Sequence, residues 1–84
     1  MLFELKPTNG RKSFYGKALI KIDEQGCTLQ SYLTDVARIE DGHLIRLWDG
    51  YSVTTMTHIN EFCKLYNLPT LSKKQWESIQ TEEA

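Results

Sequence analysis

Two stretches of the chain hold side chains whose types could bind another molecule. The first combines cations with aromatic rings, namely Arg11, Lys12, Phe14, Tyr15 and Lys17. Cations follow phosphates and aromatic faces stack on bases, so this mixture is typical of nucleic-acid contact. Nucleic-acid modules usually carry net positive charge, whereas this chain has a formal net charge of -1. We therefore favour the alternative interpretation, in which Phe14 is a core residue and the cations lie on a solvated strand face.

The second stretch, 51–58, is rich in hydroxyl groups. Four hydroxyl residues lie within six positions: Ser52, Thr54, Thr55 and Thr57. Such residues lower helix propensity, and only one or two of them can cap a helix, so the surplus favours a binding role. The candidate binding residues here are Tyr51, Thr54, Thr55 and His58. We expect Tyr51, Thr54 and His58 to form one polar patch with Arg11 and Lys12. The structural alternative, which we favour for His58, is a buried, hydrogen-bonded histidine.

Catalytic and metal-binding patterns are weak. Ser52, His58 and Asp49 can be grouped as a triad, but no nucleophile-elbow sequence accompanies them. His58 and Cys63 are five residues apart on the expected helix and so point about 140° from each other. The sequence predicts no catalytic residue, no metal and no cofactor. Cys27 and Cys63 are expected to be free thiols rather than a disulfide.

A helix over 53–66 must position the second stretch. Met56, Ile59, Phe62 and Cys63 form an apolar stripe with helical spacing. Ser52 and Thr54 are alternative caps for its start, while Asn67 and the following proline indicate its end. A second, short helix over 73–80 is predicted from a capping box, because a serine precedes a glutamine by three residues in Ser72–Gln75.

Short strands are predicted before the first helix, at 2–5, 14–22, 27–34, 36–39 and 43–48. Gly16 inside the second run indicates a bulge or a close approach. Leu29 and Leu33 are in phase in the third. The last strand is apolar on both faces, which predicts either a central position or a sheet that curls into a partial barrel. The expected fold class is α+β: a small antiparallel meander of four or five strands packed against one main helix, plus a short second helix.

Length and composition limit the function. Eighty-four residues make a single domain, 1–84, too small for a deep cleft. There is no apolar run long enough to span a membrane and no signal-peptide core, so the protein is expected to be cytoplasmic. Residues 1–22 are cationic and residues 23–42 are anionic, so the two segments are expected to neutralise each other as neighbouring strands.

Two longer motifs carry a resemblance. They are Arg11-Lys12-Ser13-Phe14-Tyr15-Gly16-Lys17-Ala18 and the segment from Trp48 to Phe62, with its Trp-Asp-Gly-Tyr-Ser start and His58-Ile59-Asn60-Glu61-Phe62 end. The segment 31–37 fits a third motif, Tyr-x-Thr-x-Val. The chain resembles a family of small uncharacterised proteins from phages, prophages and other mobile elements of Gram-positive bacteria. The resemblance covers most of residues 9–66 and implies an origin rather than an activity.

These observations favour a non-enzymatic binding module of a mobile genetic element, acting by contact with a host or phage macromolecule. A protein partner is expected, and a homodimer would enlarge the surface of so small a chain. The alternative function is nucleic-acid binding through residues 11–17. A small enzyme is the third hypothesis.

Overall fold

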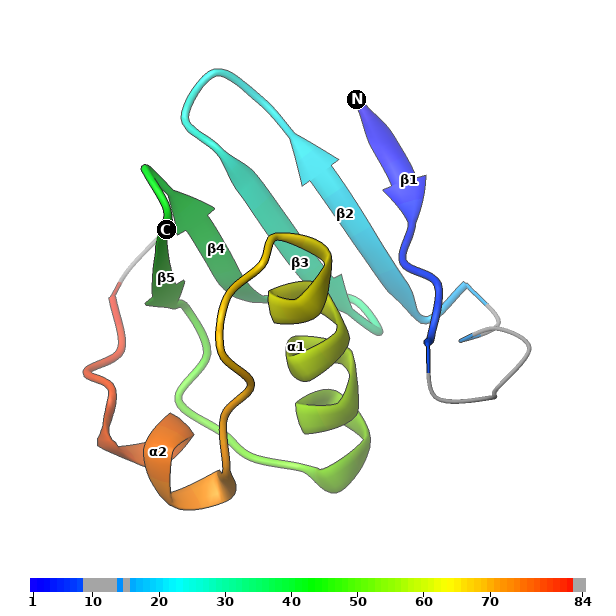
Figure 1. Cartoon of the computed structure of the whole chain (residues 1–84). Helices are drawn as coiled ribbons and strands as arrows, with labels where there is room; N and C mark the ends of the chain where they lie inside the picture. Colours follow the sequence, from blue (N-terminus) through cyan, green and yellow to red (C-terminus); the bar gives the residue numbers. More distant parts are fainter. Residues whose placement is uncertain (9–13, 15, 83–84) are drawn as a thin grey trace.

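The computed structural model describes residues 1–8, 14 and 16–82 as one antiparallel sheet with a helix across one face (Figure 1). The strands are β1 (Leu2–Glu4), β2 (Ala18–Ile22), β3 (Cys27–Ser31), β4 (Thr34–Glu40) and β5 (His43–Arg46). The helices are α1 (Val53–Leu65) and α2 (Lys73–Ser78). Each strand pairs with its neighbours in the chain, in the order β1-β2-β3-β4-β5. The expected α+β meander with one main helix and a short second helix is confirmed.

The turns between strands explain two of the glycines. Asp41 (φ 50°) and Gly42 (φ 76°) both adopt left-handed angles in the two-residue β4–β5 turn, as the Asp-Gly pair predicts. Gly26 ends the β2–β3 loop where a Cβ atom would collide with the carbonyl oxygen of Ile39. The close packing of this loop against β4 therefore requires a glycine at that position.

Three strand predictions are wrong in detail. The second strand begins at Ala18 rather than at residue 14, because Gly16 (φ 74°) belongs to a turn and not to a bulge. The third strand ends at Ser31, and a two-residue turn, Tyr32 and Leu33, leads into β4. Leu33, expected to face the core with Leu29, is therefore 93% exposed. The last strand, β5, is an edge strand rather than a central one.

The β5 edge is covered by the end of the chain rather than by another strand. The amide of Glu82 donates to the carbonyl oxygen of Arg46 at 2.7 Å, and Thr81 forms a parallel bridge with Arg46. This contact gives the Arg46 carbonyl a hydrogen-bond partner on an edge strand whose outward backbone groups would otherwise be unpaired.

The hydrophobic core lies between α1 and one face of the sheet. On the sheet side, Ile20, Leu29 and Ala37 lie in register on adjacent strands and are fully buried. On the helix side the predicted stripe supplies the buried side chains Met56, Ile59, Phe62 and Cys63. Period-2 strands and a period-3.6 helix thus place their apolar residues in one layer.

The ends of α1 follow from local sequence. Ser52 is the N-cap, and its hydroxyl oxygen accepts a hydrogen bond from the amide of Thr55. At the other end Asn67 (φ 59°) adopts the left-handed conformation, while the amide of Leu68 donates to the carbonyl oxygen of Cys63 at 2.8 Å. This is a Schellman motif, which ends the helix one residue before the predicted boundary.

Helix α2 starts with the predicted capping box of Ser72 and Gln75 and is fastened to the rest of the molecule by Arg46. The Arg46 guanidinium donates to the carbonyl oxygens of Trp76 and Ile79, both at 3.1 Å, and lies 4.7 Å from the centre of the Trp76 ring. It also donates to the carbonyls of Trp48 and Gly50 in the connection between β5 and α1. One buried cation therefore joins β5, this connection and α2.

The opposite face of the sheet mixes polar side chains with Leu2, Leu19 and Ile45, and no helix covers it within the described residues. Lys21 on β2 pairs with Asp35 on β4 at 2.6 Å across the intervening β3, so, contrary to the expectation, this contact between the cationic and anionic segments does not join neighbouring strands. Arg38 lies between Asp23 and Glu40, at 3.4 and 3.2 Å. Backbone hydrogen bonds from Gln25 and Gly26, with Arg38 nearby, lower the pKa of Asp23, so its carboxylate stays charged.

Candidate functional site

His58 is the centre of a buried polar cluster between α1 and the end of β3. Its Nδ1 atom lies 2.8 Å from the Ser31 hydroxyl, which lies 3.1 Å from the Thr55 hydroxyl. Phe14 packs edge-on against the His58 ring, with 4.5 Å between ring centres. The four side chains are 1 to 4% exposed. The structural interpretations of His58 as a buried, hydrogen-bonded histidine and of Phe14 as a core residue agree with this geometry.

The buried cluster continues along α1 to Glu61, one turn after His58. The Glu61 carboxylate accepts hydrogen bonds from the Thr8 hydroxyl at 2.8 Å and from the Thr8 amide at 3.1 Å. Lys64 lies 3.6 Å away and is half exposed. Glu61 therefore attaches the segment after β1 to α1 across 53 residues of sequence, a role that its place in a helix does not reveal.

The Ser31 hydroxyl and the His58 imidazole resemble the Ser-His pair of a hydrolase, but both groups are buried, and burial keeps a substrate away from them. A nucleophile must contact its substrate, and Ser31 is only 2% exposed beneath the β3–β4 turn. The hydrogen bonds join β3 to α1, so their direct effect is to fix the position of the helix on the sheet. The triad of Ser52, His58 and Asp49 is not assembled, because His58 Nδ1 bonds Ser31 and the Ser52 hydroxyl caps α1.

Above the buried cluster lies an exposed surface formed by Lys17, Tyr32 and Leu33, here called the turn surface. The Tyr32 ring packs against His58 with 5.9 Å between ring centres, and the Lys17 ammonium lies 5.7 Å from the centre of the Tyr32 ring. The amide of Tyr32 donates to the carbonyl oxygen of Lys17. Tyr32 is 45% exposed and Leu33 is 93% exposed. The turn surface thus combines a cation, an aromatic ring and an aliphatic side chain.

The other candidate binding residues do not all lie at this surface. Thr54 is exposed on the first turn of α1, whereas Thr55 is buried against Ser31. Tyr51 is half buried, and its ring lies 4.9 Å from the Lys73 ammonium of α2. Arg11, Lys12 and Tyr15 lie outside the described residues. The predicted patch therefore lacks His58 as an exposed member, because its ring faces the core.

Tyr32 and Leu33 were not among the candidate binding residues, because neither residue type indicates a turn. Two-residue hairpin turns usually contain Gly, Asn or Asp, which tolerate positive φ angles. Tyr32 instead adopts φ 57°. Since both residues are also typical of strands, the sequence pattern extended the strand through them.

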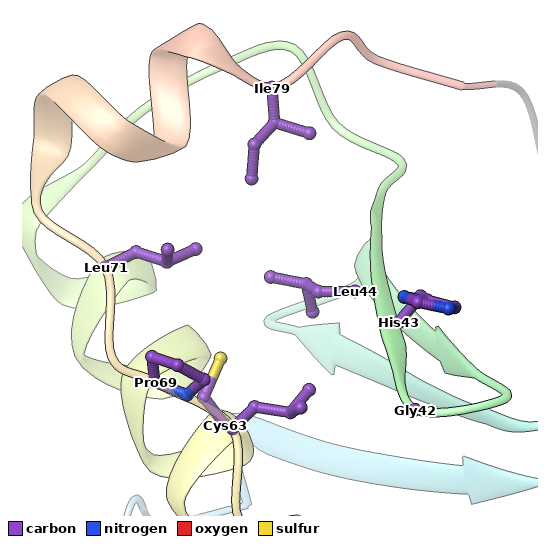
Figure 2. Close-up of a pocket in the computed structure, with 8 residues that line it drawn as sticks. Gly42, His43, Leu44, Cys63, Pro69, Leu71 and Ile79 are labelled. Atoms are coloured by element: carbon purple, nitrogen blue, oxygen red, sulfur yellow. The ribbon is translucent and has the colours of Figure 1, made fainter.

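A second surface feature is an apolar groove of about 200 Å³ between β5 and the end of α1. It is lined by Leu44, Cys63, Leu68, Pro69, Leu71 and Ile79, with the β4–β5 turn at one side. Figure 2 shows the side chains of Leu44, Leu71 and Ile79 pointing toward one another across the open space. Asn60 holds one wall in place, since its side-chain amide bonds both the carbonyl and the amide group of Leu71.

Both cysteines are free thiols, as predicted. Burial raises the pKa of the Cys63 thiol to about 11. The pKa of Tyr66 is raised to about 12, first by burial and then by its hydrogen bond with Cys27. The raised pKa of Cys63 makes its thiol a weak nucleophile at neutral pH. Among the described residues no group of three or more His, Cys, Asp or Glu side chains could hold a metal ion.

The described part of the chain also has no helix that is long and apolar enough to cross a membrane.

In a comparison with known families, residues 3–78 fit the model of a family of unknown function, DUF8033. No curated protein and no solved structure shows a significant match. Because the family model covers most of its length, the chain belongs to this family.

Proposed function

We propose that this member of DUF8033 is a non-enzymatic binding module of a mobile genetic element, acting in the cytoplasm by contact with a host or phage macromolecule. The resemblance of its two long motifs to phage and prophage proteins supports the origin. The turn surface of Lys17, Tyr32 and Leu33 supports the mode of action.

The observation that carries the proposal is the exposed Tyr32-Leu33 pair at a turn. A tyrosine with positive φ is disfavoured by roughly 1 kcal/mol or more relative to Gly or Asn. An exposed leucine gains nothing from burial in the isolated molecule. A glycine in place of Tyr32 would suit the positive φ better, so folding alone does not account for this choice of residues. Burial against a partner would account for it.

The rigidity of the turn surface supports the same function. Hydrogen bonds join Ser31, just before the turn, to α1, and His58 supports the Tyr32 ring from below. A surface held in one conformation loses little entropy when a partner binds. The hydroxyl and imidazole groups that could have reacted with a substrate instead provide this support.

Affinity capture with a Leu33→Lys variant tests the proposal. The tagged protein should retain a macromolecular partner from its host, and Leu33→Lys should weaken this capture about tenfold or more, as loss of a central interface residue does. Leu65→Lys is the matched control, because Leu65 is a half-exposed leucine on α1 outside the turn surface. Unchanged capture by Leu33→Lys, with both variants folded, would exclude the turn surface as the contact site.

Nucleic-acid binding is the alternative function, and the Lys17 ammonium beside the exposed Tyr32 ring is the observation that favours it. Labelled single- and double-stranded oligonucleotides should then bind at low salt and dissociate as salt rises, because phosphate contacts release counterions. Tyr32→Asn removes the ring while suiting the positive φ, and Lys17→Gln removes the charge. Binding that neither variant weakens would place the contact elsewhere, and no binding at low salt would exclude this function.

A further inference from the structure

The turn surface and the apolar groove lie at opposite ends of the same sheet. Strand β4 begins directly after Leu33 and ends at the β4–β5 turn, which forms one side of the groove (Figure 1). A contact between the turn surface of one copy and the groove of another therefore joins different surfaces, head to tail, rather than the same surface twice.

The sizes of the two features match. A cavity of about 150 Å³ lined by aliphatic side chains accommodates a benzene ring. The groove, at about 200 Å³, accommodates one leucine side chain and part of a neighbouring residue. Leu33 projects from the turn with 93% of its surface exposed, and Tyr32 lies beside it. The Leu33 side chain is therefore small enough and apolar enough to bind in the groove.

The charges around the two features are opposite in sign. Lys17 is exposed at the turn surface and makes no ion pair with another described residue. At the groove end, the β2–β3 loop carries Asp23 and Glu24, and the β4–β5 turn carries Asp41, all exposed. Of these three carboxylates, the described ion pairs neutralise only Asp23, through Arg38. Opposite charges favour the approach of one copy's turn surface to the other's groove and disfavour contact between two turn surfaces.

We propose that the partner of the turn surface is a second copy of this chain, with Leu33 of one copy seated in the groove between Leu44, Leu71 and Ile79 of the next. The proposal rests on the proposed function, in that the turn surface is a contact surface. An open chain of copies keeps a free turn surface at one end and a free groove at the other. Such assemblies grow beyond the dimer as the protein concentration rises, into a chain or, where the rotation between copies closes, into a ring.

Sedimentation velocity over micromolar to millimolar concentrations tests this arrangement. The wild type should form species beyond the dimer, and added salt should shorten them because the attraction between Lys17 and the acidic groove end is screened. Leu33→Lys should raise the dissociation constant about tenfold or more. Leu65→Lys should associate like the wild type. A wild type that stays monomeric at millimolar concentration, or a Leu33→Lys variant that associates unchanged, overturns the proposal.

Variants of the groove complete the test. Ile79→Trp fills the groove from a position whose side chain already points into it (Figure 2). Pro69→Arg, at an exposed position, adds a cation to the groove that repels Lys17. Each variant should lose self-association while keeping its far-UV circular dichroism spectrum. If Ile79→Trp does not fold, Pro69→Arg carries the test.

Mixing distinguishes head-to-tail contact from every symmetric dimer. Leu33→Lys retains an intact groove, and the groove variant retains an intact turn surface, so the mixture should form a one-to-one heterodimer and nothing longer. A mixture that stays monomeric, or a symmetric dimer that survives in both single variants, overturns the proposal. If the wild type is monomeric while Leu33→Lys still loses a captured partner of another kind, this inference fails and the proposed function stands.

Discussion

Thr54 and Thr55 show how strongly the position of a single residue decides its role. Both are threonines in the first turn of α1, yet Thr54 faces solvent and Thr55 is 4% exposed against Ser31. The Thr55 hydroxyl is part of the bonding that joins β3 to α1. Comparing substitutions at Thr54 and Thr55 therefore measures how much the buried hydrogen bond between Thr55 and Ser31 contributes to stability.

Replacing Thr55 with alanine should lower the free energy of unfolding by about 1 to 2 kcal/mol, because a buried hydrogen bond to Ser31 is lost. Thr54→Ala should change it by no more than about 0.5 kcal/mol, as exposed substitutions do. Urea denaturation of both variants provides the comparison. Equal losses in the two variants would show that the Ser31–Thr55 contact does not contribute in solution.

At the scale of elements, Arg46 determines how α2 docks. Its guanidinium is 6% exposed and bonds backbone carbonyls instead of a carboxylate. Carbonyl oxygens near the end of α2 are the negative end of the helix dipole, so they suit a buried cation. The planar guanidinium reaches several of them at once, which a lysine ammonium cannot do.

Arg46→Met should therefore destabilise the protein by about 2 to 4 kcal/mol, since several buried carbonyls lose their donor. Arg46→Lys should recover only a small part of this loss. Hydrogen exchange should report faster exchange of the α2 amides before global unfolding. The control is Lys21→Met on the open face of the sheet, where the Lys21–Asp35 pair is exposed, and it is expected to cost no more than about 1 kcal/mol. If α2 exchange is unchanged in Arg46→Met, Arg46 does not fasten this helix.

The elements with local signals were predictable from the sequence, and the contacts between distant residues were not. Ser52, Asn67 and the Ser72–Gln75 capping box define the helix ends through neighbours a few residues away. The pairing of His58 with Ser31 spans 27 residues, and no pattern within either segment indicates it. The β3–β4 turn was missed for a different reason, since Tyr32 and Leu33 are typical strand residues placed in a turn.

At the scale of the whole molecule, burial of titratable groups limits stability in alkali. Burial raises the pKa of Cys63 from 9.0 to about 11, and burial with a Cys27 hydrogen bond raises that of Tyr66 from 10.0 to about 12. The folded state therefore holds these protons more tightly than the unfolded state does. The stability that they contribute is present below about pH 9 and is lost as the pH rises through these values.

The free energy of unfolding should consequently fall between about pH 9 and pH 12. Cys63, which is fully buried, should account for about 2 to 3 kcal/mol of this fall. Denaturant melts across this range give the measurement. In Cys63→Ala the decline should be shallower, although the variant starts from a lower stability because of the cavity. A decline equally steep in Cys63→Ala would assign it to other groups.

The sequential strand order has a kinetic consequence. Because β3 and β4 are joined by two residues, and β4 and β5 by another two, most of the sheet can form by closing short loops. Such local topologies fold faster than sheets with crossing connections. Two contacts of large sequence separation, Thr8 with Glu61 and Arg46 with Ile79, join segments far apart in the chain. Folding should therefore begin in the β3–β4–β5 hairpins, and the attachment of the residue 8 segment and of α2 should follow the rate-limiting step.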